Sequence, residues 1–319
     1  MSKNNKKYFE KSGKANLTTG KIKIKENINI FKCPVCGDKM NLDVFKSIIC
    51  LNKHCFDISK KGYINLLLKP SKYKYDKEMF EARNSICKMG FFDPLIESIV
   101  SLIYNNISIN SSNNISYTRI LDAGCGEGYH LSQVMKKLQK KEDVHFQGVG
   151  IDISKDGIQF AAKNYKDIIW CVADLAKIPF MDKKFDIVLN ILSPSNYSEF
   201  NRIIHSEGIL IKVVPNSGYL KELRDLLYQG TNRELYSNEK VIEHFNRNFE
   251  KIDTEKVSYN VSVSRDELSH LIKMTPLSWG ASEGIIKKVL DNKIDSITVD
   301  FTIIIGKSKK QISLPKWES

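Results

Sequence analysis

The strongest constraint on the fold lies in residues 120–130, which read Ile-Leu-Asp-Ala-Gly-Cys-Gly-Glu-Gly-Tyr-His. A short apolar segment ends at an acid, Asp122, and runs directly into a turn that contains Gly124, Gly126 and Gly128. Because glycine tolerates positive φ and places no Cβ between backbone and ligand, the segment predicts a strand that ends in a ligand-binding loop. A purely structural turn is the alternative when this loop is considered alone.

The carboxylate inside this loop narrows the choice of ligand. Glu127 would repel the pyrophosphate that a G-x-G-x-x-G loop binds, but it suits a ligand with a cationic amino group, such as S-adenosylmethionine (SAM). Two more acids follow apolar segments: Asp152 after residues 149–151, and Asp174 at the end of residues 168–174. Parallel strands place such acids along one edge of a sheet. This series of acids resembles that of the class I SAM-dependent methyltransferases.

A cluster of cysteines near the N-terminus indicates a metal site. Cys33-Pro-Val-Cys36 is followed after thirteen residues by Cys50, and then by His54 and Cys55. A C-x2-C turn presents two thiolates, and a second knuckle completes the closed tetrahedral shell of a structural zinc site. We expect Cys33, Cys36, Cys50 and His54 to bind Zn²⁺, with Cys55 as the alternative to His54. An odd total of seven cysteines, four of them in this segment, argues against a disulfide framework.

The charge of the chain is distributed unevenly. The net charge is +12, and residues 1–26 contain eight lysines against Glu10 and Glu26. High charge with few apolar residues predicts a disordered arm, which either only solubilises the protein or adds salt-dependent affinity for RNA. No segment has the roughly 20 apolar residues that span a bilayer, or the apolar core of a signal peptide. We therefore expect a soluble, cytoplasmic protein with no membrane partner.

Apolar segments alternate with amphipathic segments through most of the chain, which predicts an α/β fold. Residues 31–70 read as a zinc ribbon of short strands, and residues 76–106 as one or two linker helices. The expected strands after the linker are 119–122, 146–152, 168–174, 185–192, 208–214, 256–263 and 296–305, and the expected helices are 129–139, 155–165 and 219–228. The predicted fold is a Rossmann-like, mostly parallel sheet wound on both faces, with a small N-terminal zinc-ribbon module.

The metal-binding and cofactor-binding segments together resemble the RlmA-type 23S ribosomal RNA guanine-N1 methyltransferases, which join an N-terminal zinc module to a class I methyltransferase domain. Besides the zinc knuckles and the Asp122 loop, the resemblance rests on four segments: Lys60-Lys61-Gly62-Tyr63-Ile64-Asn65-Leu66-Leu67, Glu78-Met79-Phe80-Glu81-Ala82-Arg83, Gly90-Phe91-Phe92-Asp93-Pro94-Leu95 and Met274-Thr275-Pro276-Leu277-Ser278-Trp279. It extends from residue 31 to about residue 305.

The resemblance implies five regions and a function. The regions are a basic arm (1–30), a zinc-binding module (31–70), a helical linker (71–115), a SAM-dependent methyltransferase domain (116–306) and a tail (307–319). The implied function is methylation of N1 of a guanine in a hairpin loop of 23S rRNA, by a homodimer whose cleft receives the RNA. Some related members are linked to macrolide resistance. The alternatives are a small-molecule methyltransferase and a non-catalytic RNA-binding factor with a SAM fold.

The resemblance also assigns roles to single residues. The loop residues would border the methionine part of SAM, Asp152 the ribose and Asp174 the adenine. Phe92 and Tyr219 would also touch the cofactor. The alternatives are that Phe92 only belongs to the core and that Tyr219 only begins a helix. The expected cofactor-binding residues are Phe92, Asp122, Gly124, Gly126, Glu127, Asp152, Asp174 and Tyr219.

The target base is expected near residues 190–194, which read Asn-Ile-Leu-Ser-Pro after the fourth strand, where methyltransferases of this class hold their target. Methylation of guanine N1 requires the loss of its proton and alignment with the methyl group. Asn190 and Ser193 are expected to hydrogen-bond the base edge, although neither is a convincing general base. Alternatively, Pro194 only terminates the strand. Trp279 is expected either to stack on a flipped base or to belong to the core.

Overall fold

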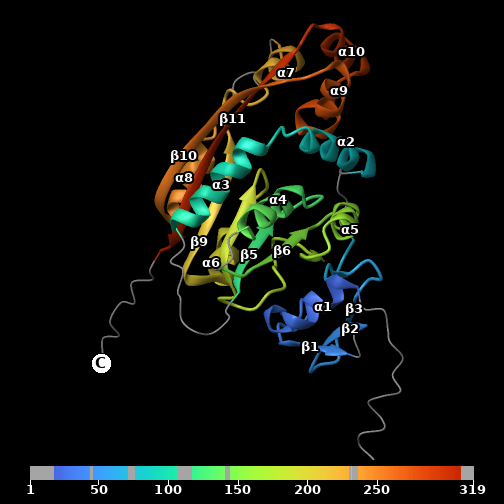
Figure 1. Ribbon diagram of the computed structural model, residues 1–319, viewed down its shortest axis with the longest axis vertical. Helices are drawn as coiled ribbons and strands as arrows, with labels where there is room; N and C mark the ends of the chain where they lie inside the picture. The colour runs from blue at the N-terminus through green and yellow to red at the C-terminus, as the bar shows by residue number, and fades with distance from the viewer. Residues whose placement is uncertain are drawn as a thin grey trace, which may run out of the picture.

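The computed structural model describes residues 18–43, 46–70, 76–106, 117–140, 144–229, 231 and 236–309. Within these residues, the centre of the protein is an eight-stranded sheet in the order β10-β11-β9-β8-β5-β6-β7-β4 (Figure 1). Strands β4 to β9 of this sheet run parallel to one another, whereas β11 is antiparallel to β9 and β10. The predicted Rossmann-like, mostly parallel sheet is therefore confirmed. Its strands are β4 (Tyr63–Asn65), β5 (Thr118–Ala123), β6 (Phe146–Asp152), β7 (Ile169–Val172), β8 (Phe185–Ile191), β9 (Ile204–Pro215), β10 (Phe249–Ser262) and β11 (Ser296–Ser308).

The strands expected after the linker are all present, but several of their ends differ: β9 begins at Ile204 instead of residue 208, and β11 continues to Ser308 instead of residue 305. β7 ends at Val172, so Asp174 lies in the loop that follows it. β10 begins at Phe249 instead of residue 256. Residues 250–254 of β10 are exposed, because this edge strand pairs only with β11. The apolar alternation that marks a half-buried strand in a sequence is therefore missing there.

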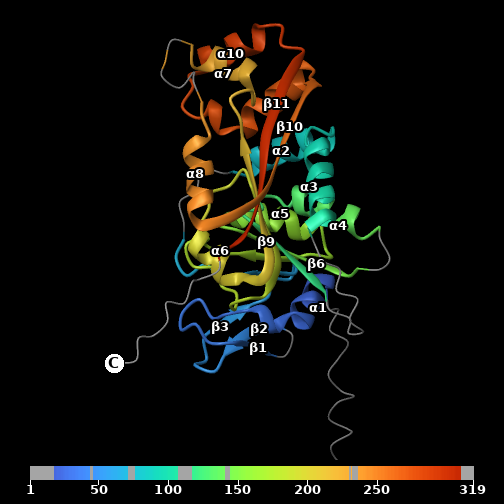
Figure 2. The ribbon, with the colours of Figure 1, turned by 90° about the vertical axis from the view of Figure 1, so that its left-hand side faces the viewer.

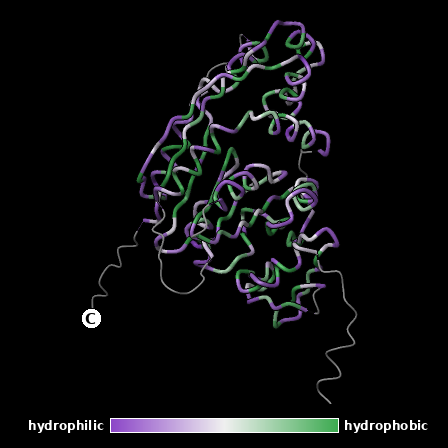
Figure 3. The backbone as a smooth tube through the Cα atoms, in the orientation of Figure 1, coloured by the Kyte–Doolittle hydropathy of each residue, from purple (hydrophilic) through white to green (hydrophobic). Residues whose placement is uncertain are grey.

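Helices cover both faces of the sheet, because successive residues of a strand point to opposite sides. In β5, Ile120 belongs to one apolar cluster and Leu121 to the other. Figure 3 shows the apolar segments of the chain concentrated between these layers. No helix within the described ranges is both long and apolar enough to cross a membrane. The first face is covered by α3 (Asp93–Asn106), α4 (Tyr129–Leu138), α5 (Lys155–Asn164) and α7 (Lys221–Leu227), and the second by α1 (Thr19–Glu26), α6 (Tyr197–Ile203), α8 (Glu239–Asn248) and the zinc module.

The zinc module packs against the second face and also contributes a strand to the main sheet. Its own antiparallel sheet consists of β1 (Met40–Asp43), β2 (Ser47–Cys50) and β3 (Cys55–Asp57). The next strand, β4, leaves this sheet and pairs with β7. The ring centroids of Phe31 and Phe180 are 5.6 Å apart, and the backbones on either side of these residues exchange hydrogen bonds. The module is thus continuous with the main eight-stranded sheet.

The expectation of a disordered arm over residues 1–30 is wrong for residues 18–30. These residues form α1 and a 3-10 turn, η1 (Ile28–Ile30). Ile24 and Ile30 are fully buried, and Asn27 Oδ1 accepts a hydrogen bond from Arg119 Nε. The lysines of α1 stay partly or fully exposed, and Ile24 is the one large apolar side chain that this helix buries, so the sequence carries no clear periodic signal for it. Residues 1–17, the rest of the predicted arm, lie outside the described residues.

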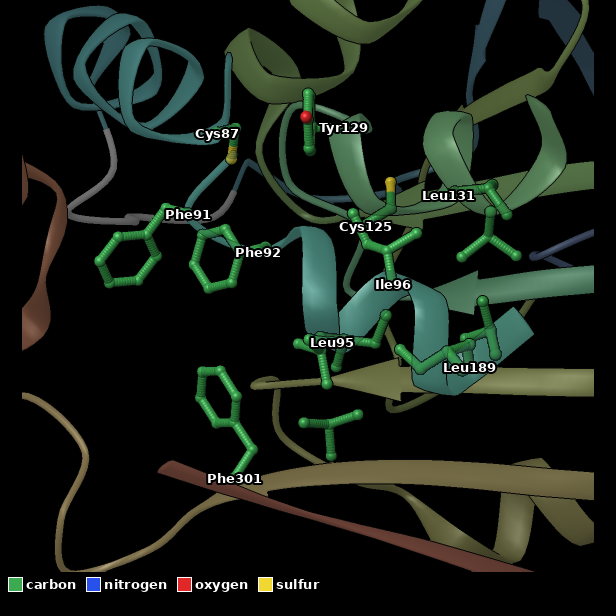
Figure 4. Packing of buried hydrophobic residues seen from close by; sticks show 14 of the residues in the cluster. Cys87, Phe91, Phe92, Leu95, Ile96, Cys125, Tyr129, Leu131, Leu189 and Phe301 are labelled. Atoms are coloured by element: carbon green, nitrogen blue, oxygen red, sulfur yellow. The ribbon is translucent and has the colours of Figure 1, made fainter. Parts of the chain in front are cut away.

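The linker helix α2 (Lys77–Lys88) packs against a C-terminal helix at the end of the molecule opposite the zinc module. This helix is α9 (Arg265–Met274), and η2 (Pro276–Ser278) and α10 (Glu283–Asp291) follow α9 in the chain. Figures 1 and 2 show α7, α9 and α10 at the opposite end of the molecule from the zinc module. Between α2 and α3, Phe92 packs against Phe91 and against Phe301 of β11 (Figure 4). The linker is therefore part of the core.

Gly150 in β6 provides a test of the packing between the central strands. A Cβ at this position would overlap with the indole ring of Trp170, which is almost fully buried. We expect Gly150→Ala to lower the free energy of unfolding by about 1–3 kcal/mol, because the ring or the strand must shift. Urea denaturation measures the change.

The matched control is Gly284→Ala in α10, where the nearest atom to the new Cβ is 4.0 Å away. This substitution should change the free energy of unfolding by no more than about 1 kcal/mol. Equal losses in the two variants would contradict the packing described for Gly150.

Candidate functional site

The four expected metal ligands converge in the zinc module. The ligand atoms of Cys33, Cys36, Cys50 and His54 all lie within 4.8 Å of one another. The Sγ atoms of Cys36 and Cys50 are 3.7 Å apart, and His54 Nδ1 lies 3.4 Å from Cys50 Sγ. A tetrahedral zinc with Zn–S bonds of about 2.3 Å requires ligand–ligand distances of about 3.8 Å. The donor set and its dimensions therefore fit Zn²⁺.

The surroundings of the cluster distinguish its members from the neighbouring Cys55. Cys55 is exposed in β3 and does not belong to the cluster found among the described residues. Hydrogen bonds from the Asn52 side chain and from the Asp38 backbone lower the pKa of Cys36 to about 6. A thiol with such a pKa readily becomes the thiolate that binds zinc. His54, and not Cys55, completes the group of four.

The glycine-rich loop lies at the carboxyl end of β5, beside the end of β6. Gly124, Gly126 and Gly128 have φ values of 87°, 55° and 81°, which other residues rarely adopt. Asp152, the last residue of β6, accepts hydrogen bonds from the backbone N–H groups of Gly126 (2.9 Å) and Ser154 (2.8 Å). The second expected acid is thus placed directly against the glycine loop.

The three acids follow neighbouring strands, but their surroundings differ. Asp122 is buried, Asp152 is half-buried and Asp174 is exposed. Oδ1 of Asp122 has no hydrogen-bond partner among the described residues, and burial raises the pKa of this carboxyl to about 8. A buried acceptor without a partner in the protein costs stability, and a cationic amino group would supply the missing interaction. The unpaired acid and the glycine cradle beside it fit SAM.

Glu127 is fully buried, and its partner comes from the linker. Arg83 of α2 places Nε 3.0 Å from Glu127 Oε2, and its Nη2 donates to His130 Nδ1 at 3.3 Å. Burial alone would lower the pKa of Arg83, but the attraction of Glu127 and of the other ionisable groups around it together outweighs burial and raises the pKa. Burial, and then Arg83, lower the pKa of His130, so this imidazole is neutral. The cation beside Glu127 is therefore a residue of the chain itself.

A cavity of about 640 Å³ opens beside the glycine loop, in the size range of ligand-binding pockets. Phe92, Ser193 and Tyr219, three of the residues expected to contact cofactor or target, line it. A Cβ on Gly124 would overlap with Ser193 Oγ, so the cavity meets the glycine loop at this point. Trp279 follows η2, is half-buried and is not among the lining residues. The expected target loop therefore borders both the cofactor loop and the cavity.

Asn190 lies beneath the cavity and does not line it. It is fully buried, and its Nδ2 donates to the carbonyl oxygens of Ala123 (2.8 Å) and Pro194 (3.0 Å). Its Oδ1 accepts hydrogen bonds from Ser195 Oγ (2.8 Å) and Lys212 Nζ (2.5 Å). The expected contact between Asn190 and a base edge does not fit this arrangement, because the amide is already used inside the protein.

Comparison with known proteins identifies the family. Residues 31–77 match the family described as "RlmA, N-terminal", and residues 115–273 match the family described as "Methyltransferase domain". YxjB of Bacillus subtilis (strain 168), provisionally named a 23S rRNA (guanine-N1-)-methyltransferase, is 43% identical over 88% of this chain and 98% of its own. The chain belongs to the RlmA-type methyltransferase family.

Other relatives of this RlmA-type chain are more distant. The 23S rRNA (guanine(748)-N1)-methyltransferase of Streptomyces fradiae is 27% identical over 80% of this chain and 88% of its own. Among solved structures, the YcgJ protein from Bacillus subtilis is 15% identical with a TM-score of 0.45, covering 66% of this chain and 97% of YcgJ. As a member of the family, the chain is a SAM-dependent methyltransferase with a structural zinc, and the non-catalytic alternative is set aside.

Sequence reasoning missed the cationic residues of this RlmA-type site, which are Arg83, Lys212, Arg224 and Lys240 among the described residues. Lys212 and Arg224 are each only 4% exposed. Lys212 had a detectable signal, because a lysine within the apolar strand 208–214 is unusual in a buried strand. Arg83 lies in one of the segments that carry the family resemblance, but its partner could not be read from the sequence.

Zinc binding can be tested with single cysteine substitutions. Purified Cys36→Ser should contain much less zinc than the wild type, because the site loses one of four ligands. Mass spectrometry of the metal content measures the ratio of zinc to protein. Cys55→Ser is the matched control, and it should keep its zinc. Zinc loss in the control, or zinc retention in Cys36→Ser, would contradict the ligand set.

Asp122 should make the stability of the SAM-free protein depend on pH. Its folded-state pKa of about 8 lies above the ordinary value of 3.8, so the folded protein binds this proton more tightly than the unfolded chain. Below about pH 4, Asp122 is protonated in both the folded and the unfolded state, and its effect on the free energy of unfolding is constant. As the pH rises from about 4 toward 8, the free energy of unfolding falls, by at most about 1.4 kcal/mol per pH unit. In urea denaturation, Asp122→Asn should gain stability relative to wild type across this window. If the difference in free energy of unfolding between Asp122→Asn and wild type does not vary with pH, Asp122 does not have the raised pKa.

Proposed function

We propose that this enzyme transfers the methyl group of SAM to N1 of a guanine in 23S rRNA. The observation that carries the proposal is the similarity of the whole chain, zinc ribbon included, to a relative named for this activity. The second relative has the same activity in its name. The cavity volume would also suit a small molecule, but an RlmA-type zinc ribbon favours rRNA. A homodimer acting in the cytoplasm belongs to the same proposal.

The cavity has chemistry that suits an unpaired nucleotide. Tyr219 and Tyr236 line it together with Lys212 and Lys240. Aromatic rings stack on unpaired bases, and cations attract the phosphates that flank them. A base inside a duplex cannot enter such a cavity without leaving its stack. We therefore place the target guanine in a hairpin loop.

Different residues would bind SAM and the target base. When bound, SAM supplies an electrophilic methyl group. In this proposal, Asp122 pairs with its amino group beside the backbone of the glycine loop, while Asp152 and Asp174 hold the ribose and the adenine. Ser193 contacts the target base, because it lies where the glycine loop meets the cavity. Lys240, exposed on α8, attracts RNA phosphates.

Primer extension on 23S rRNA tests the proposal. A methyl group on N1 blocks Watson–Crick pairing and stops reverse transcriptase. We expect one stop to be missing in a strain that lacks the gene. Incubation of the extracted rRNA with the purified enzyme and SAM should restore it, and Asp152→Ala should restore it much more slowly because its loss weakens SAM binding by about 1–3 kcal/mol.

Labelled SAM separates the two candidate substrate classes. Radioactive methyl groups should enter 23S rRNA at the position of the restored stop. If the label enters a small-molecule extract and not rRNA, the enzyme is a small-molecule methyltransferase and the proposal is wrong.

A further inference from the structure

Methylation at guanine N1 requires removal of a proton, yet the described residues that line the cavity include no carboxylate to accept it. The electron pair of N1 becomes available only when the proton leaves. Among the described residues that line the cavity, none is an aspartate or a glutamate. The ionisable side chains there, apart from tyrosines, are Arg83, Lys212, Arg224, Lys240 and His244. This lining suits an anionic ligand better than it suits proton abstraction by a carboxylate.

Lys212 of β9 lies where the cavity meets the glycine loop. Its Nζ donates to Asn190 Oδ1 at 2.5 Å and to the carbonyl oxygen of Ser193 at 2.6 Å. Ser193 is the residue whose hydroxyl fills the space beside Gly124. An ammonium group has three N–H donors, so one donor of Lys212 has no protein partner within the described part of the chain. This donor is available to a ligand in the cavity.

No carboxylate among the residues that the structure describes balances the charge of Lys212. Burial lowers its pKa to about 8, and no attraction from an acid opposes this effect. Lys212 is therefore mostly protonated at neutral pH, and its buried positive charge costs stability unless a ligand compensates it. A glutamine could bond the same loop without this penalty. Buried charges without a counter-charge in a cleft are typical of functional sites.

We propose that Lys212 stabilises the N1-deprotonated form of the target guanine by donating its third N–H to O6, which carries much of the negative charge of that anion. This inference rests on the proposed function, because it takes guanine as the substrate. The N1 proton passes to water, the N1 electron pair forms the bond to the methyl carbon, and the carbon–sulfur bond breaks with its electrons left on sulfur. Guanine and SAM thus give N1-methylguanine, S-adenosylhomocysteine and a proton. Lys212 keeps its own proton throughout.

The other ionisable groups that face the cavity are less suited to this role. Arg83 already forms an ion pair with a buried acid. Arg224 donates to two backbone carbonyl oxygens. Lys240 and His244 on α8 are exposed, so water and salt screen them. Tyrosine is neutral at pH 7 even at its ordinary pKa, and burial raises the pKa values of the three tyrosines of the lining further; they are Tyr197, Tyr219 and Tyr236.

A 6-thioguanosine probe reports the ionisation of N1 directly, because the ultraviolet absorbance of thioguanine differs between the neutral base and the anion. The probe is the 23S rRNA hairpin that the wild-type enzyme methylates, with 6-thioguanosine at the target position. It is bound to the full-length enzyme together with S-adenosylhomocysteine and titrated with base. We expect thioguanine to lose its N1 proton more easily when it is bound to the wild-type enzyme than in the free hairpin. Its acid dissociation constant should rise by roughly tenfold or more, so its pKa should fall. Lys212→Met should remove most of this increase.

The rate of a single turnover on the unmodified hairpin gives an independent measure. At pH 7, Lys212→Met should be slower by roughly 10²–10³-fold. The difference should shrink as the pH rises, because N1 then loses its proton without help. Lys212→Arg keeps a positive charge but cannot accept a proton, so it should retain most of the rate if Lys212 acts by its charge.

The matched control is Lys240→Met, which removes an exposed cation from the same cavity. It should weaken RNA binding but leave the ionisation of bound thioguanine as in wild type. Unchanged ionisation in a Lys212→Met protein that still binds SAM in calorimetry would overturn the inference. If Lys212→Met does not fold, Lys212→Gln replaces it in the titration, with the same expected loss and the same contradicting outcome.

Failure of this inference can be told apart from failure of the proposed function. The hairpin is defined by methylation with the wild-type enzyme, so an error in the proposed function appears as a lack of product before any variant is made. An error in the role of Lys212 appears only in the comparison of wild type with its variants.

Discussion

Asn190 donates the two hydrogens of its amide to two backbone carbonyl oxygens, one at Ala123 before the glycine loop and one at Pro194 beside the cavity. One buried side chain therefore ties the place where SAM fits to the place where the target would enter. Group transfer depends on this spacing, because a small misplacement of the reacting atoms slows the reaction severely. Ser195 and Lys212 bond the amide oxygen, so all of the polar atoms of Asn190 are engaged.

The zinc module supports the other side of the cofactor site. The Lys177 ammonium donates to the carbonyl oxygen of Pro34, between the two cysteines of the first knuckle, and the backbone N–H of Lys32 donates to Pro179. These contacts brace the loop that begins with Asp174. A segment as small as the module buries little apolar surface, so zinc contributes to its folding free energy. The metal thereby also stabilises the loop on which one of the expected cofactor acids lies.

The sequence predicted those parts of the fold that demand particular residue types at fixed spacing. Glycines in the Asp122 loop and cysteines in the knuckles have few substitutes, and Ile120 and Leu121 in the middle of β5 are both apolar because both faces of the sheet are covered. The exposed start of β10 and the lysine-rich α1 have no such constraint, so their patterns were weak or misleading. The sequence also singled out residues 190–194, which lie between the glycine loop and the cavity, but not the direction of the Asn190 side chain. That direction depends on partners such as Ala123, which only the folded chain brings into reach.

The same reasoning explains why the cationic residues of the site were missed. Arg83 lies on a linker helix and meets Glu127 only through the tertiary fold. Lys212 has no acidic partner at all among the described residues, so a search for charge pairs would not find it. A lysine in an apolar strand is noticeable in the sequence, but its meaning depends on whether the ammonium reaches a cavity or the surface.

β4 has only three residues and comes from the segment that carries the zinc knuckles, yet it forms one border of the main sheet. If it were removed, β7 would present its unpaired backbone N–H and C=O groups, and such bare strands invite pairing with other chains. A catalytic fragment cut free of its metal-binding neighbour would therefore be prone to aggregation. For the same reason, the zinc ribbon could not be replaced by another domain during evolution unless a new edge strand took the place of β4.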